Sequence, residues 1–252
     1  MNFPVTGRIL VVAHRGSSGS APENTLAAFR MAVDAGADMI ELDVRMTKDY
    51  HLVVHHDARL GRTVRGSGFV WEKTLQELKF LDAGGWFAPR FRGETVPSLR
   101  EVMDLLPSHV GLNIEVKTDG DPRKDRAMEE SCILLIRERG FEQRVILSSF
   151  DHALLRRLHS LDPALAIGAL YVPVRDVARK PSAIARRTGA TAFICSRTQL
   201  RRRHVEDAHA HDIAVAVYGI NTLRHLAGVR RRGVDVVVTD FPERIVRALR
   251  QR

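Results

Sequence analysis

Residues 39–46 read MIELDVRM, and apolar side chains alternate with charged ones along this stretch. Successive side chains of a strand point to opposite faces, so the apolar residues share one face while Glu41 and Asp43 share the other. The pattern is typical of a strand with one face in water, and equally of a strand that carries a metal site. The other predicted strands decide between these two interpretations.

Polar side chains also gather at the ends of two further predicted strands, ILVVAHRG at residues 9–16 and GLNIEVK at residues 111–117. The residues that share this position are His14, Arg15, Asn113, Glu115 and Lys117. In a barrel of parallel strands, functional groups lie at the carboxyl ends of the strands. Three strands with the same arrangement favour one common polar site over three unrelated exposed faces.

Short β-branched segments alternate along the whole chain with amphipathic segments of helical period. Strands are predicted at residues 9–13, 39–44, 111–116, 145–148, 166–169, 192–195, 213–218 and 236–239. Helices are predicted at residues 25–35, 74–81, 123–139, 153–160, 201–211, 223–232 and 242–250, with caps at Asn24, Asp151 and Asn221. Eight strands with helical regions between them predict an α/β fold, a (β/α)₈ TIM barrel, in one domain of residues 1–252. A doubly wound sheet is the competitor, but its G-x-G-x-x-G fingerprint is absent after the first strand.

Residues 58–97 interrupt the second connection with an irregular stretch rich in glycine and arginine. The stretch is too long for a plain loop, so we expect a small insertion with a role, such as a cap over the site. Its aromatic residues are expected to form a small core or to line the substrate entrance: Trp71, Trp86, Phe87 and Phe91.

The chain is basic, with 39 Lys and Arg against 30 Asp and Glu and a formal charge of +9. A basic surface attracts phosphates, nucleic acid or anionic lipids. The arginine clusters at residues 201–203 and 230–232 have no aromatic residues between them for base stacking, so we expect no nucleic-acid partner.

Cys132 and Cys195 lie far apart in the sequence and predict a reducing compartment, where thiols stay free. The apolar run within residues 1–16 is too short for a signal peptide or a membrane helix. We therefore expect a cytoplasmic protein without stable membrane insertion.

A hairpin is predicted after the second strand, where TKDYHLVVHHD (residues 47–57) contains turn formers and then returns as a β-rich run. If the turn is centred between Asp49 and Tyr50, residues whose numbers sum to 99 face each other. Asp43 then opposes His56 at the barrel mouth, and His55 points to the other face.

The predicted site combines three carboxylates, Glu41, Asp43 and Glu115. Without a counter-ion they would repel one another strongly, and a divalent cation removes this repulsion. All-oxygen ligation favours Mg²⁺ or Ca²⁺ over zinc.

Two imidazoles, of His14 and His56, are suited to proton transfer near neutral pH. Arg15 and Lys117 beside a metal indicate an anionic substrate, most simply a phosphate. Together these groups predict phosphodiester cleavage.

Five motifs resemble those of the glycerophosphodiester phosphodiesterases: HRGSSGSAPENTLAAF, GADMIELDVRMTKDYHLVVHHD, LGRTVRGSG, NIEVK and GVDVVVTDFPE. They follow the family's order from His14 to about Pro242. The resemblance implies a (β/α)₈ barrel with a small insertion after the second strand, and metal-dependent hydrolysis of small-molecule glycerophosphodiesters to sn-glycerol 3-phosphate and an alcohol.

Carried over by motif, the resemblance implies the following roles. The metal ligands are Glu41, Asp43 and Glu115; the catalytic pair is His14 and His56; Arg15 and Lys117 hold the phosphate. Two positions depart from the family. Tyr218 of VAVYGIN stands at or near a tryptophan position and is expected to wall the glycerol side, and His55 replaces an aromatic residue.

Three rival functions stay open: a barrel enzyme acting on a sugar phosphate or carbonyl substrate, lysophospholipase D-type cleavage at the same site, and a basic binding module without catalysis. An apolar channel in the insertion would favour the lipid substrate.

Some residues have two interpretations. Glu23 contacts the site or orients its loop, and Asp57 orients His56 or begins the loop. Asp240 is expected to cap the last helix rather than to bind a metal, and His209 and His211 are likewise expected at the surface rather than on a metal.

Overall fold

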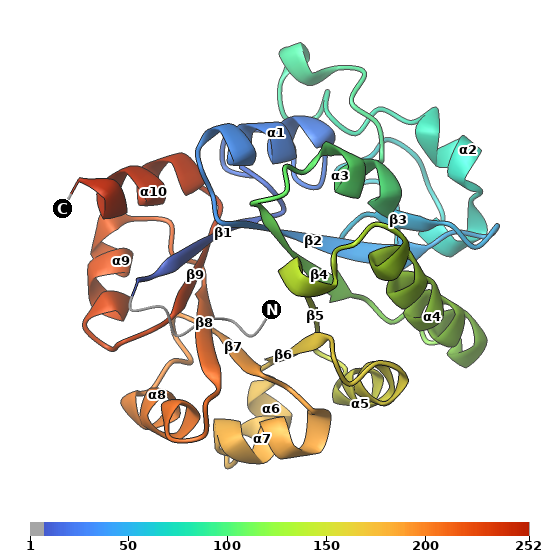
Figure 1. Cartoon of the computed structure of the whole chain (residues 1–252). Helices are drawn as coiled ribbons and strands as arrows, with labels where there is room; N and C mark the ends of the chain where they lie inside the picture. The colour runs from blue at the N-terminus through green and yellow to red at the C-terminus, as the bar shows by residue number, and fades with distance from the viewer. Residues whose placement is uncertain (1–7, 252) are drawn as a thin grey trace.

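The computed structural model describes residues 8–251, and within them eight parallel strands close into a barrel (Figure 1). The strands are β1 (Leu10–His14), β2 (Met39–Met46), β4 (Gly111–Val116), β5 (Val145–Ser149), β6 (Ala166–Leu170), β7 (Ala192–Ser196), β8 (Ala214–Tyr218) and β9 (Val236–Thr239). β1 pairs with β9 on one side and with β2 on the other, which closes the barrel. The predicted (β/α)₈ fold is confirmed.

Helices surround this barrel and follow the strands along the chain (Figure 1). They are α1 (Leu26–Asp34), α3 (Leu99–Leu105), α4 (Pro122–Glu138), α5 (His152–Leu161), α6 (Pro173–Asp176), α7 (Pro181–Thr188), α8 (Arg202–His209), α9 (Leu223–Arg230) and α10 (Pro242–Arg250). The outward strand residues Leu42 and Ile114 belong to one buried cluster with Phe29 of α1. Among residues 8–251, no helix has the length and apolar character needed to cross a membrane.

The barrel interior changes from apolar to polar along the strands. A separate buried cluster of small and branched side chains, including Val12, Ala166 and Ala192, fills the lower layers. Above it, the same inward face carries Glu41 and Asp43 of β2 and Glu115 of β4, and Glu41 lies level with His14 at the end of β1. Because alternation assigns each residue to one face, the polar ends all point to the barrel mouth.

The predicted register of the hairpin was wrong by one residue. β2 pairs with β3 (Leu52–Val54) so that Val44 faces Val54, and the backbone N–H of His55 donates to the carbonyl of Asp43. The turn closes with a hydrogen bond from the Thr47 N–H to the His51 carbonyl, and Tyr50 takes a left-handed φ of 63°. Three-residue hairpin loops commonly use such a residue, whereas the prediction assumed an even-numbered loop.

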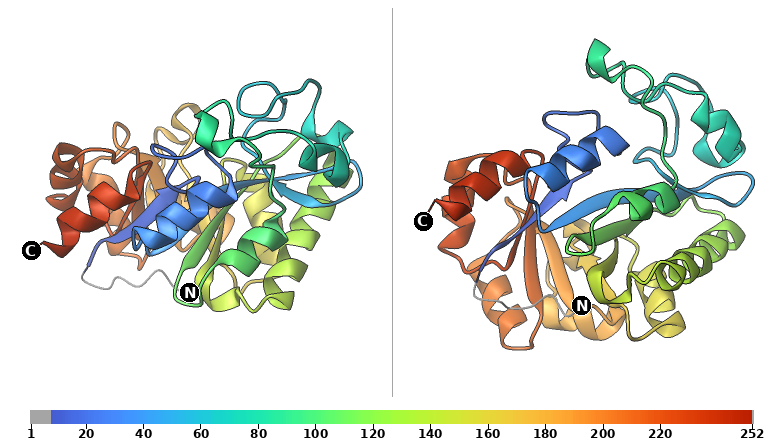
Figure 2. Two further views of the ribbon diagram at one scale, coloured as in Figure 1. Left: turned by 90° about the horizontal axis from the view of Figure 1, so that it is seen from above. Right: turned by 45° about the horizontal axis from the view of Figure 1, so that its top comes forward.

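The insertion, residues 58–97, packs against the β2–β3 hairpin on the outside of the barrel (Figure 2). It contains helix α2 (Leu75–Lys79) and two 3₁₀ turns, Val70–Glu72 and Pro89–Phe91. Its core is aliphatic and comprises Leu60, Val64, Val70, Leu78, Ala83 and Val96, together with Val53 of β3.

The expected aromatic core of the insertion is therefore wrong. Trp86 is 43% exposed, and Trp71 stacks on Phe69 outside the aliphatic cluster. The guanidinium of Arg90 lies over the ring of Phe91. Branched aliphatic side chains fill the small interior, and the aromatic rings lie outside this aliphatic cluster.

Candidate active site

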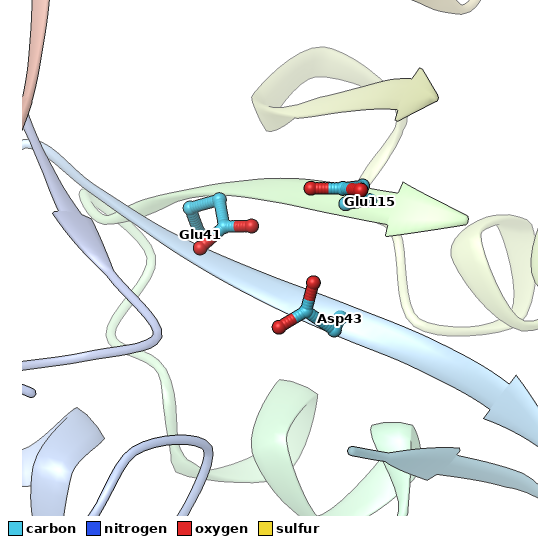
Figure 3. A group of neighbouring side chains, drawn as sticks. All are labelled: Glu41, Asp43 and Glu115. Atoms are coloured by element: carbon cyan, nitrogen blue, oxygen red, sulfur yellow. The ribbon is translucent and has the colours of Figure 1, made fainter. Parts of the chain in front are cut away.

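Three carboxylates converge at the barrel mouth, two from β2 and one from β4 (Figure 3). Asp43 lies directly beside Glu115 in the parallel register of these strands. One oxygen of each of Glu41, Asp43 and Glu115 lies within 4.8 Å of the others, and Asp43 is fully buried. The structure thus brings the three predicted acids together.

The electrostatics of the three acids are uneven. Burial, with the neighbouring charge of Asp43, raises the pKa of Glu41 to about 7, and burial also raises the pKa of Glu115. Burial would raise the pKa of Asp43 as well, but the Lys117 ammonium and the Arg15 guanidinium outweigh it and hold that pKa below its ordinary value. The cluster therefore lacks positive charge mainly around Glu41.

This donor set fits a hard divalent cation. Buried carboxylate oxygens close together are the ligands that Mg²⁺ and Ca²⁺ prefer, and a carboxyl that retains its proton near neutral pH has room for further positive charge. Glu41, Asp43 and Glu115 are the residues that would hold such an ion.

Two cations flank the acids. The Lys117 Nζ atom lies 2.9 Å from Asp43 Oδ1 and also contacts Glu115. Arg15 Nε lies 3.2 Å from Asp43 Oδ2, and the Arg15 backbone N–H donates to Glu41 Oε2 at 2.9 Å.

The backbone at Arg15 and Gly16 is left-handed, with φ of 54° and 83°. A Cβ atom on Gly16 would lie 2.7 Å from the backbone of Ala28. Only glycine therefore allows β1 to turn so tightly into its loop, which explains the H-R-G sequence.

His14 forms a pair with Asp240, whose Oδ1 lies 2.7 Å from His14 Nδ1. Burial would lower the pKa of His14, but the charge of Glu41 and the bond to Asp240 raise it. Asp240 also accepts from Asn221 Nδ2 at 2.5 Å. The predicted helix cap at Asp240 is wrong, because the N-cap position of α10 belongs to Phe241.

His56 forms a second pair of this kind with Asp57, with 2.7 Å between Nδ1 and Oδ1. Of the two interpretations of Asp57, the geometry fits the one in which it orients the imidazole. In both histidines a carboxylate contacts Nδ1, so Nε2 is the ring nitrogen that this pair leaves available.

The predicted register was wrong, but the pairing of β2 with β3 ends before His56, so the register does not fix the direction of the His56 side chain. His55 is buried, and its Nδ1 contacts the Asp57 carbonyl while its Nε2 lies 3.4 Å from Thr63 of the insertion. The guanidinium of Arg45 donates two hydrogen bonds to the His56 carbonyl, at 3.0 and 2.8 Å. The chain therefore turns after His55 and carries His56 toward the acids.

Comparisons with known proteins agree with this geometry. The model of the glycerophosphoryl diester phosphodiesterase family matches residues 14–244. The chain belongs to this family. A glycerophosphodiester phosphodiesterase of Caldanaerobacter subterraneus is 39% identical, over 97% of this chain and 99% of that protein. One from Bacillus subtilis is 34% identical, over 94% and 85%.

Solved structures of the family superimpose along nearly the whole chain. A glycerophosphodiester phosphodiesterase from Agrobacterium tumefaciens has a TM-score of 0.84 and 31% identity, covering 95% of this chain and 99% of that one. An Oleispira antarctica phosphodiesterase in complex with the product sn-glycerol-3-phosphate has a TM-score of 0.88 and 27% identity, covering 98% of each. These findings confirm the resemblance noted in the sequence and make the chain an enzyme of the phosphodiesterase class.

In this phosphodiesterase, Tyr218 ends β8 and packs against the inner apolar cluster at the mouth. Of the three predicted caps, only Asp151 caps its helix. Thr25 and Thr222 cap α1 and α9, because the asparagine before each turns inward instead. Asn24 donates to Asp43 Oδ2 at 2.8 Å, and Asn221 donates to Asp240.

The sequence left two interpretations open for Glu23, contact with the site or orientation of its loop, and it assigned no role to Arg62. Glu23 accepts from Arg15 at 2.8 Å and from Arg62 at 2.7 and 2.9 Å, so it contacts the site through Arg15. His209 and His211 do not form a metal pair: His209 contacts Asp235 and His211 contacts a backbone carbonyl.

Proposed function

We propose that this phosphodiesterase hydrolyses glycerophosphodiesters to sn-glycerol 3-phosphate and an alcohol, and that Glu41, Asp43 and Glu115 hold a divalent cation, Mg²⁺ or Ca²⁺. The observation that carries the proposal is the three-carboxylate cluster with a carboxylate-paired histidine beside it on either side. The similarity to a phosphodiesterase bound to sn-glycerol-3-phosphate supports the choice of substrate.

A bound cation would neutralise phosphate charge and act as a Lewis acid. Arg15 and Lys117 contact the same carboxylate, Asp43, and in this proposal they bind the phosphate oxygens. The Tyr218 ring is expected to form the wall on the glycerol side.

His14 and His56 carry out the proton transfers in this proposal. One imidazole takes a proton from the nucleophile, and the other gives a proton to the leaving alkoxide. The nucleophile is the substrate's own glycerol 2-hydroxyl, through a cyclic phosphate that water then opens, or water itself. Asp240 and Asp57 orient the two rings and stabilise each as an imidazolium.

The lysophospholipase D alternative depended on an apolar channel in the insertion. Aliphatic side chains fill the interior of the insertion instead, and Trp86 lies at its surface. No observation on the described residues favours an acyl-chain substrate.

The test uses purified protein with glycerophosphocholine, glycerophosphoethanolamine, glycerophosphoglycerol, lysophosphatidylcholine and bis-p-nitrophenyl phosphate, with and without EDTA. We expect release of glycerol 3-phosphate that EDTA abolishes and Mg²⁺ or Ca²⁺ restores. Absence of turnover of every diester, with Mg²⁺, Ca²⁺ and Mn²⁺ each supplied, would exclude the function.

We further propose that the chain works in the cytoplasm as one catalytic domain, insertion included. Cys132 and Cys195 are free and buried, which suits a reducing compartment.

A further inference from the structure

Arg62 of the insertion contacts two carboxylates that belong to different parts of the site. Its Nε donates to Asp57 Oδ2 at 2.6 Å, and its two terminal nitrogens donate to both oxygens of Glu23, at 2.9 and 2.7 Å. Asp57 holds His56 at 2.7 Å, and Glu23 holds Arg15 at 2.8 Å. One guanidinium thus joins the support of a histidine to the support of a phosphate-binding arginine.

The geometry suits arginine in particular. A planar guanidinium binds one carboxylate through two parallel hydrogen bonds and still offers Nε to a second. Burial would raise the pKa of Asp57, but the bonds from Arg62 and His56 lower it to about 2. Both supporting carboxylates therefore stay ionised at neutral pH, as acceptors for His56 and Arg15.

The backbone that carries Arg62 is anchored on both sides. Leu60 and Val64 are buried in the aliphatic core of the insertion, and the Gly61 N–H bonds to the Val64 carbonyl at 3.0 Å. Thr63 is buried against His55. The Arg62 side chain thus projects from a fixed turn toward the mouth.

We propose that Arg62 is a positioning residue that aligns His56 and Arg15 at the same time, so that the insertion is part of the catalytic machinery and not only a cover. The inference rests on the proposed function. The contact of Arg62 with Asp57 fixes the position of the His56 imidazole and so affects kcat. The contact of Arg62 with Glu23 fixes the orientation of Arg15 and so affects the KM for the diester.

The test compares Arg62→Met and Arg62→Lys with the control Arg65→Met. Arg65 lies on the same loop, is exposed, and faces Asp82 instead. We expect Arg62→Met to lower kcat/KM by about 10- to 100-fold, through both a lower kcat and a higher KM, because small displacements of catalytic groups have effects of this size. A lysine reaches only one of the two carboxylates. Arg62→Lys should therefore change either kcat or KM, but not both. Arg65→Met should match the wild type.

Double variants separate the contact of Arg62 with Asp57 from its contact with Glu23. Asp57→Asn should lower kcat, and Glu23→Gln should raise KM, and each should have a much smaller effect when Arg62→Met is already present. Calorimetric binding of Mn²⁺ should be the same in Arg62→Met and wild type, because Arg62 contacts none of the three acids.

Two results would overturn the inference: Arg62→Met and Arg62→Lys within twofold of Arg65→Met, or full additivity with both Asp57→Asn and Glu23→Gln. If Arg62→Met fails to fold, Arg62→Lys carries the same comparison. A wild-type protein without diesterase activity would instead count against the proposed function.

Discussion

Asp240 shows how a single residue at the barrel mouth acquires its role. It lies just beyond β9, and the closure of the barrel places it beside His14, 226 positions earlier in the chain. We expect Asp240→Asn to lower kcat by about 10- to 100-fold with little change in KM, because an amide neither favours the imidazolium nor selects the tautomer. Steady-state kinetics with glycerophosphoethanolamine checks this. The exposed turn variant Asp212→Asn serves as the control, and equal kcat values for the two variants would contradict the role.

Glu41 gives a prediction of pH dependence. Its pKa of about 7 lies above the ordinary 4.5, so the folded protein binds this proton more tightly than the unfolded chain does. The resulting stability is fully present below pH 4.5 and is lost as pH rises through 7. In EDTA, Glu41→Gln should therefore match the wild type near pH 5 and exceed its Tm by several degrees near pH 8.

Added Mg²⁺ or Ca²⁺ should reverse this order at pH 8, since only the wild type has all three carboxylates. Thermal unfolding followed by circular dichroism measures both effects. A difference in Tm that does not change with pH would show that Glu41 ionises normally.

At the scale of elements, Arg45 of β2 joins two mouth loops. It is buried, forms an ion pair with Asp119 of the β4–α4 loop, and donates two hydrogen bonds to the His56 carbonyl. Removing one partner of a buried ion pair leaves the other charge uncompensated, at a cost of roughly 3–5 kcal/mol.

We therefore expect Arg45→Met to lower the free energy of unfolding by about this amount and to reduce kcat through His56. The double variant Arg45→Met/Asp119→Leu should recover much of the stability but not the activity, because the His56 carbonyl still lacks its donor. Urea unfolding and kinetics separate the two. A double variant no more stable than Arg45→Met would show that the ion pair is not the source of the loss.

At the scale of the whole molecule, the two cysteines can be used to test whether the barrel unfolds cooperatively. Cys132 on α4 and Cys195 on β7 are buried in the same large cluster, and burial raises the pKa of both thiols to about 12. If the chain unfolds as one domain, both thiols should react with a maleimide at the same rate, because the same global opening exposes both. Mass spectrometry resolves the two sites. Labelling of one thiol well before the other would show that part of the barrel opens separately.

The sequence alone determined the parts of this protein that depend on neighbouring residues. Alternation with a period of two identified the strands and assigned Glu41, Asp43 and Glu115 to one inward face, because each residue's face follows from the residue before it. The predictions of two helix caps and of the hairpin register were each wrong by one residue. Thr25 and Thr222 cap their helices in place of Asn24 and Asn221.

The pairing of each carboxylate with a histidine or with Arg15 depends on contacts that form only when the chain is fully folded. Asp240 meets His14 because β9 closes against β1, and Arg62 meets Glu23 because the insertion folds back onto the first loop. Such pairs leave no local period in the sequence, since the residues come together only when the barrel closes. The three acids of the proposed metal site thus follow from the pattern of single strands, while the groups that contact the histidines and Arg15 are largely a property of the closed barrel.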